Sequence, residues 1–197
     1  MTTTLIVPGL HGSGPDHWQS WWQATDAGAV RVAQQDWETP DLARWRDAVA
    51  AAIDAEEEPV WIVAHSFGCL ASVAAIRARP GRVAGAFLAA PADPDRFDLR
   101  RQLEGPPLAA PSLLVASSND PWLSLLKAAW WGQQWGSRLV SIGAAGHVNP
   151  ASGFGPWIEG LGLFRDFARS VAAAPRGEID GNSMLWEAPA FLRPAVR

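Results

Sequence analysis

Short apolar runs alternate with longer amphipathic segments along this chain. Each apolar run is bounded by glycine, proline or polar residues and is typical of a buried strand. The predicted strands are residues 4–7, 30–33, 60–63, 83–88, 113–115 and 139–142. The longer segments repeat apolar side chains at helical spacing, as Trp18, Trp21 and Trp22 do at i, i+3 and i+4. The predicted helices are residues 16–23, 41–57, 68–79, 121–135 and 157–172.

This alternation predicts the fold class. Continuous apolar strands separated by helices are typical of a mostly parallel sheet covered on both faces, which is a three-layer α/β/α sandwich. A length of 197 residues suits one domain, expected over residues 1–172. Residues 173–197 break the alternation with several prolines, so we expect an irregular C-terminal extension packed on the same domain. Its expected anchors are Leu185, Trp186 and Phe191.

Composition and charge exclude several classes of function. The chain is 48% hydrophobic with a net charge of −4, which predicts a folded protein without the basic surface of a nucleic-acid binder. It has no apolar run long enough to span a membrane, and no secretion signal is expected at its start, so no membrane partner is expected. Cys69 is the only cysteine, so no intrachain disulfide is expected and a cytoplasmic location is predicted. The 12 tryptophans are expected mainly to fill the core.

The strongest sign of chemistry is a serine between a predicted strand and a predicted helix. The strand at 60–63 leads into Ala64-His-Ser-Phe-Gly68, where a helix begins. Hydrolases that form an acyl-enzyme hold their serine on such a turn, written G-x-S-x-G, because only small residues fit beside it. Alanine replaces the first glycine here at the least steric cost. The alternative is a chance turn of small residues, but its position favours Ser66 as a nucleophile.

A serine nucleophile needs a base and an acid that orients the base. In the α/β-hydrolase fold these residues follow the serine in the order acid, then histidine. His147 is the only histidine after Ser66, and it follows the last predicted strand. Asp120 follows the penultimate strand and is the expected acid, although its place before a proline would also suit a helix N-cap. Asp93, after the preceding strand, is the rival acid.

The loop after the first strand, Pro8-Gly-Leu-His-Gly-Ser-Gly14, completes the expected site. We expect an oxyanion hole from the backbone N–H groups of Leu10 and Phe67, and substrate contacts from His11 and Trp122. The loop reads G-x-x-G-x-G rather than G-x-G-x-x-G, so no dinucleotide cofactor is predicted. The histidines show no metal-ligand spacing, and neither a metal nor any other cofactor is expected.

These motifs together resemble the retinoblastoma-binding-protein-9-like small serine hydrolases. The resemblance covers residues 4–170 and implies a compact α/β-hydrolase sheet of strand order 2-1-3-4-5-6. It also implies a triad of Ser66, Asp120 and His147. The segments that carry it are Pro8-Gly-Leu-His-Gly-Ser-Gly-Pro-Asp-His-Trp18, Gln35-Asp-Trp-Glu-Thr-Pro40, Ala64-His-Ser-Phe-Gly68, Asn119-Asp-Pro121 and Gly146-His147.

The predicted reaction is hydrolysis of a small acyl compound, most simply a carboxylic ester, through an acyl-enzyme on Ser66 with His147 as general base. The alternatives are amide or peptide cleavage, and a module that binds a protein partner on a hydrolase scaffold. No protein partner is indicated by the sequence. The proline-rich segment between the fourth and fifth strands is too short for a cap domain. A shallow, open pocket walled by Leu10, Phe67 and Trp122, with a preference for short acyl groups, is therefore predicted.

Overall fold

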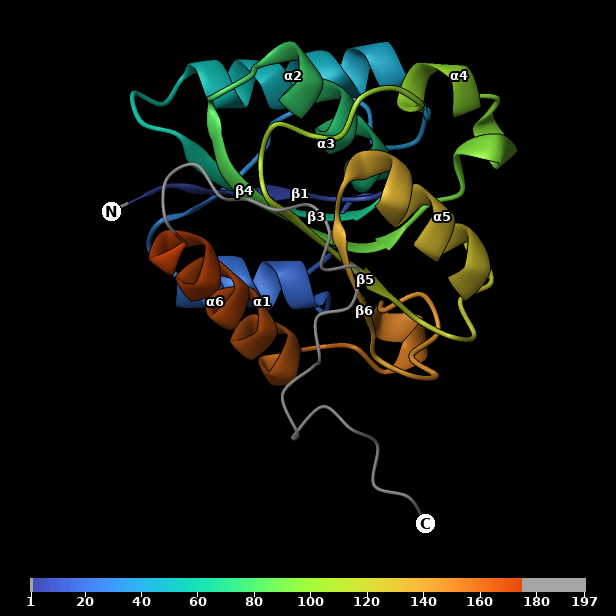
Figure 1. The fold of residues 1–197 in the computed structure, drawn as a ribbon. Helices are drawn as coiled ribbons and strands as arrows, with labels where there is room; N and C mark the ends of the chain where they lie inside the picture. The colour runs from blue at the N-terminus through green and yellow to red at the C-terminus, as the bar shows by residue number, and fades with distance from the viewer. Residues whose placement is uncertain (1, 175–197) are drawn as a thin grey trace.

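Six parallel strands form one sheet at the centre of the molecule (Figure 1). The structure is a computed structural model that describes residues 2–174, so nearly all of the extension expected at 173–197 lies outside the described residues. The strand order β2-β1-β3-β4-β5-β6 confirms the expected topology. The strands are β1 (Thr4–Val7), β2 (Ala29–Arg31), β3 (Val60–Ser66), β4 (Val83–Pro91), β5 (Ser112–Ala116) and β6 (Arg138–Ser141).

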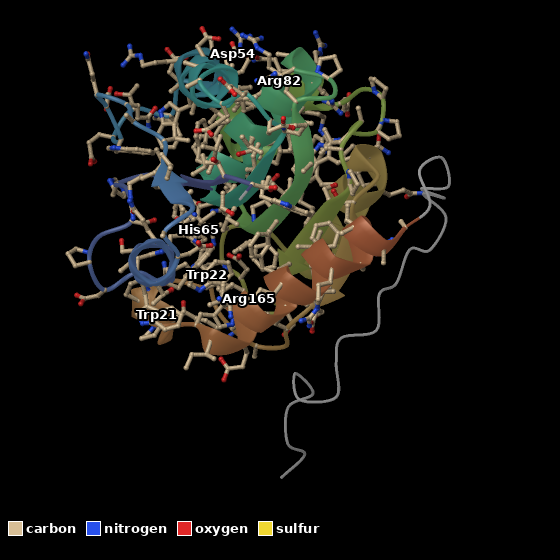
Figure 2. All side chains as sticks on the ribbon, turned by 90° about the vertical axis from the view of Figure 1, so that its left-hand side faces the viewer. Trp21, Trp22, Asp54, His65, Arg82 and Arg165 are labelled. Carbon is tan, nitrogen blue, oxygen red and sulfur yellow. The ribbon has the colours of Figure 1, made fainter. Side chains whose placement is uncertain are left out.

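Helices cover both faces of the sheet and create two hydrophobic cores. Figure 1 shows α1 and α6 on one face and α2, α3 and α5 on the other. Figure 2 shows Trp22 on the side of α1 that is turned toward the interior, where it packs against Phe87 of the sheet and Phe164 of α6. The helices are α1 (Trp18–Thr25), α2 (Leu42–Asp54), α3 (Phe67–Ala78), α4 (Arg100–Leu103), α5 (Leu125–Trp135) and α6 (Ile158–Ala173).

Tryptophan fills much of both cores, as the composition predicted. Trp18, Trp45, Trp131 and Trp135 are almost completely buried. Their indole rings supply large apolar areas in a chain whose helices are rich in alanine. The described part of the chain places one tryptophan, Trp122, on the wall of the pocket described below.

The central strands run further than predicted, and this extension forms the site. β3 continues to Ser66 because its last residues still pair with β4, and β4 continues to Pro91 opposite it. Polar His65 is therefore part of a buried strand, where the sequence pattern had predicted a turn.

Helix α5 starts four residues later than the predicted position 121. The Asp120 carboxylate accepts a hydrogen bond from the Trp122 backbone N–H at 2.8 Å, which closes a turn instead of starting the helix. Ser124 is the actual N-cap and accepts from the Lys127 N–H. The alternative in which Asp120 caps this helix is therefore wrong.

The segment between β4 and β5 has only two short helical pieces, η1 (Pro94–Phe97) and α4. This agrees with the prediction that no cap domain is inserted there. Ion pairs tie the segment to α5, since Lys127 Nζ lies 2.6 Å from Asp93 and 2.7 Å from Asp95. Among residues 2–174 there is no helix of the length and hydropathy that a membrane span requires.

Candidate active site

Ser66 lies at the point where β3 passes directly into α3. Its backbone has φ 53° and ψ −124°, a strained conformation for a residue with a side chain. Although Ser66 occupies the N-cap position of α3, its hydroxyl does not cap the helix. The turn instead leaves the hydroxyl free to face other groups.

Two glycines allow the tight approach of the chain at this turn. A Cβ atom at Gly68 would lie 2.2 Å from the carbonyl oxygen of Pro8 and 2.7 Å from that of Val7. A Cβ atom at Gly9 would lie 2.7 Å from Cβ of Ser66. Both positions therefore require glycine, whereas the buried position of Ala64 accepts a methyl group.

The structure brings Ser66, His147 and Asp120 together in one hydrogen-bonded relay. Nε2 of His147 lies 2.9 Å from Oγ of Ser66. Nδ1 of the same ring lies 3.0 and 2.9 Å from the two carboxylate oxygens of Asp120. The side chains of His147 and Asp120 are only 8% and 2% exposed, so water competes little for these hydrogen bonds.

The loop that carries His147 is held by polar residues to which the sequence analysis gave no role. Ser117 Oγ accepts from the Ala145 N–H and donates to Asn119, and Asn119 Oδ1 accepts from the Gly146 N–H. Ser152 Oγ accepts from the backbone N–H of His147 itself. These hydrogen bonds join the loop after β6 to the loop that bears Asp120.

The rival acid Asp93 lies elsewhere and has other partners. Its carboxylate is almost completely buried, pairs with Lys127 and accepts from the Asp95 N–H at the start of η1. No hydrogen bond joins it to His147 within the described chain. The geometry therefore places Asp120, and not Asp93, beside the histidine.

The loop after β1 passes over Ser66 and presents the backbone of Leu10. Among the described residues, the N–H groups of Leu10 and Phe67 have no acceptor in the surrounding turns and loops. Gln19, which the sequence analysis also missed, anchors this loop to the ends of β1 and β3. Its buried amide donates to the carbonyls of Val7 and Val63 and accepts from the Ser13 hydroxyl at 2.6 Å.

A pocket of about 360 Å³ opens over Ser66. Leu10, His11 and Trp122 line it, as predicted, but the Phe67 side chain does not, and that expectation is wrong. The Phe67 ring is fully buried and packs edge-on against Trp45 and Phe97, so only the backbone of this residue faces the site. Phe97 takes its place on the wall.

The two predicted substrate contacts sit at the more exposed part of the pocket. The His11 side chain is 75% exposed, and its Nδ1 lies 2.6 Å from the Glu38 carboxylate. The centre of the Trp122 ring lies 6.0 Å from that of the His147 ring, and the Arg96 guanidinium lies over the Trp122 ring, 5.1 Å from its centre. Both side chains can therefore contact a bound molecule, and both are also held by a charged neighbour.

Two further histidines, His17 and His65, line the pocket beside His147. The rings of His17 and His65 are 4.8 Å apart, and Nε2 of His65 lies 2.9 Å from the carbonyl oxygen of His147. Figure 2 shows His65 well inside the molecule, far from Asp54 and Arg82 at the surface. The signal that could have revealed it is its place directly before the serine, at the end of a buried strand.

Burial keeps both of these histidines neutral. It lowers the pKa of His17 from 6.5 to about 4, with help from the positive charge of Arg31 and from His147. Burial also holds the pKa of His65 well below the ordinary value, and the two neighbouring histidines lower it further. No group of metal-ligating side chains is present in the described part of the chain.

Comparison with known proteins decides the family. The model of the family described as serine hydrolase matches residues 4–166. The chain belongs to this serine hydrolase family. A search of the curated proteins finds no match.

Three solved structures are similar to this serine hydrolase. A YdeN-like hydrolase from Pectobacterium atrosepticum is 38% identical, with a TM-score of 0.83 over 87% of this chain and 92% of that chain. The ydeN gene product of B. subtilis is 20% identical, with a TM-score of 0.68 over 88% and 100% of the two chains. An α/β serine hydrolase homologue from Coxiella burnetii, 17% identical over 86% and 85% of the chains, has a TM-score of 0.61 and shares the fold.

The neutral histidines predict that this hydrolase loses stability in acid. The pKa of His17 is about 4 in the folded protein and near 6.5 when unfolded, so between these values the unfolded chain binds more protons. The stability that the neutral form of His17 contributes is complete above about pH 6.5 and is lost as the pH falls toward 4. This loss is on the order of 3 kcal/mol in the free energy of unfolding for His17 alone. The expected result is a steep fall in the free energy of unfolding, measured by urea denaturation between pH 7 and pH 4.

A His17→Asn variant provides the control for this prediction. Asparagine is a good N-cap and can replace the His17 ring nitrogen that accepts from the Gln19 N–H, but it does not titrate. The variant should therefore lose less stability than the wild type over the same pH range. Equal losses in the two proteins would show that His17 is not the group that titrates.

Proposed function

We propose that the chain hydrolyses small carboxylic esters through an acyl-enzyme on Ser66. The observation that carries this proposal is the relay in which Ser66 Oγ, His147 and Asp120 are joined by hydrogen bonds of 2.9 to 3.0 Å. The relay borders the pocket over Ser66, where a substrate carbonyl can approach the hydroxyl. Membership of the serine hydrolase family supports the same class of reaction.

Acylation begins when Ser66 Oγ attacks the carbonyl carbon and His147 Nε2 takes the hydroxyl proton. The Asp120 carboxylate accepts from Nδ1–H, which fixes the tautomer and stabilises the imidazolium that forms. The negative charge on the carbonyl oxygen is bound by the N–H groups of Leu10 and Phe67. The helix dipole of α3, which begins at Phe67, favours the same charge.

The tetrahedral intermediate then collapses, and the oxygen of the leaving alcohol takes the proton from His147. This leaves Ser66 as an ester of the substrate's acid. In deacylation His147 removes a proton from water, and the resulting hydroxide attacks the acyl carbonyl. Collapse returns the proton to Ser66 Oγ and releases the carboxylic acid.

Two alternatives receive less support. A protein-binding module on a hydrolase scaffold would not need Ser66, Asp120 and His147 in hydrogen-bonded order, yet all three are present. Amide cleavage would use the same relay, and among the described residues that line the pocket no contact selects for an amine leaving group. We also propose that the chain lies in the retinoblastoma-binding-protein-9-like branch of the family, on the motifs around Gly9 and Ser66.

The size of the pocket predicts a preference for short acyl groups. With only η1 and α4 between β4 and β5, a long acyl chain would leave most methylenes in water and forgo about 0.8 kcal/mol for each CH₂. We expect kcat/KM for p-nitrophenyl esters to be highest at about two to six acyl carbons. The Ser66→Ala variant gives the background rate. A maximum at about twelve carbons or beyond would mean that a deep acyl pocket exists.

A further inference from the structure

The His17 side chain presents an unused hydrogen-bond donor to the pocket. The residue is only 5% exposed, and it lines the pocket together with Ser66 and His147. Nδ1 of His17 accepts from the backbone N–H of Gln19 at 3.2 Å and so caps α1. A neutral imidazole that accepts at Nδ1 carries its proton on Nε2.

This Nε2–H group has no acceptor among the described residues. The Nε2 atom is not completely buried, and the residue lines the pocket, so a molecule bound there can reach this donor. A nearly buried donor without a partner is costly unless a bound molecule supplies an acceptor. The low pKa of His17, about 4, means that the group is a neutral donor at neutral pH.

His17 lies near the loop of His147, the residue that protonates the leaving group. The next residue, Trp18, donates from its indole N–H to the carbonyl of Val148 at 2.9 Å, which joins α1 to the loop that carries His147. The His65 ring lies between the two other histidines, 4.8 Å from the ring of His17 and 4.9 Å from that of His147. The leaving oxygen must face His147 to receive its proton. We therefore expect the rest of the alcohol to lie on the side of the pocket that His147 shares with His65 and His17.

We propose that His17 binds the alcohol part of the substrate by donating its Nε2–H to a hydroxyl or ether oxygen beyond the scissile bond. This inference rests on the proposed ester hydrolysis. No lysine or arginine of the described chain lines the pocket, whereas Asp16 does, so no cation of the wall is available to pair with an anionic alcohol part. The substrates are therefore short-chain esters of neutral alcohols that carry a second oxygen, such as glycol or polyol esters.

The test compares methoxyethyl acetate with butyl acetate, which have the same chain length but differ in one ether oxygen. We expect the kcat/KM ratio of the two esters to fall about fivefold in His17→Asn relative to the wild type, because one hydrogen bond is lost. Asparagine keeps the cap on α1 and removes the Nε2–H. Comparing ratios between proteins cancels the intrinsic reactivity of each ester.

Two controls separate this contact from general damage to the pocket. The Pro15→Ala variant changes another residue that lines the pocket but has no side-chain hydrogen-bond donor, so it should keep the wild-type ratio. A pair that differs in the acyl part, ethyl methoxyacetate and ethyl butyrate, should show the same ratio in the wild type and in His17→Asn. An unchanged ratio for the first pair, or a change confined to the acyl pair, would overturn the inference.

Two outcomes outside this scheme are also decisive. If the wild type hydrolyses none of these esters, the proposed ester hydrolysis itself is wrong, and the role of His17 falls with it. If His17→Asn does not fold, the wild type labelled with isotopic histidine can be titrated with methoxyethanol and with butanol. A shift of the His17 ring resonances by methoxyethanol only is expected, and equal effects of the two alcohols would contradict the proposal.

Discussion

Replacing Asp120 with asparagine is expected to lower the turnover of an ester substrate about 10⁴-fold. The Asp120 carboxylate accepts from Nδ1 of His147 at 2.9 Å and so keeps the Nε2 lone pair directed at Ser66. An asparagine amide can instead donate to Nδ1, which puts the ring proton on Nε2 and prevents it from accepting the serine proton. Steady-state kinetics on a p-nitrophenyl ester of a short acid measures the effect.

The Asp93→Asn variant is the matched control. It makes the same chemical change in a buried carboxylate that pairs with Lys127 and has no hydrogen bond to His147 in the described chain. Its effect should appear in the free energy of unfolding, since the Lys127 charge loses a partner, while turnover stays close to wild type. The reverse pattern, with Asp93→Asn inactive and Asp120→Asn mild, would mean that the acid is wrongly assigned.

The second large effect is expected from Gly68→Ala, which should destabilise the fold by about 3 kcal/mol or more. The new methyl group would lie 2.2 Å from the Pro8 carbonyl oxygen, and neither backbone can move without displacing the loop that presents Leu10. Urea denaturation measures the stability, and any folded fraction should have lost esterase activity.

The same substitution at Gly162 should have the opposite effect. Gly162 lies inside α6, where an added Cβ atom meets nothing within 4 Å. Alanine there should stabilise the protein by about 0.5 to 1 kcal/mol through its higher helix propensity. If Gly68→Ala were tolerated as well as Gly162→Ala, the close packing of the elbow against β1 would be wrong.

The fold and the three residues of the relay could be predicted because their signals are local. A buried strand, a small-residue turn and a helix around Ser66 lie within about twenty residues of sequence. His147 had no competitor after the serine, and the order of elements narrowed the acid to Asp120 or Asp93. Parallel strands bring their carboxyl ends to one edge of the sheet, so residues that follow different strands meet there.

The remaining parts of the site depend on contacts that sequence spacing does not encode. The direction of the Phe67 side chain is set by Trp45 and Phe97, which come from distant segments. Gln19 gains its role from carbonyls at the ends of β1 and β3. His17 and His65 are recognisable as pocket residues only once α1 is placed beside the loop of His147.

The most direct test of the central claim is reaction of the protein with a fluorophosphonate, followed by peptide mapping. The relay predicts one labelled residue, Ser66, because among residues 2–174 only its hydroxyl faces a histidine that can take the proton. The Ser66→Ala variant should remain folded and unlabelled, and Asp120→Asn should label far more slowly. Label on Ser13, Ser117 or Ser141, or none on the folded wild type, would contradict Ser66 as the nucleophile.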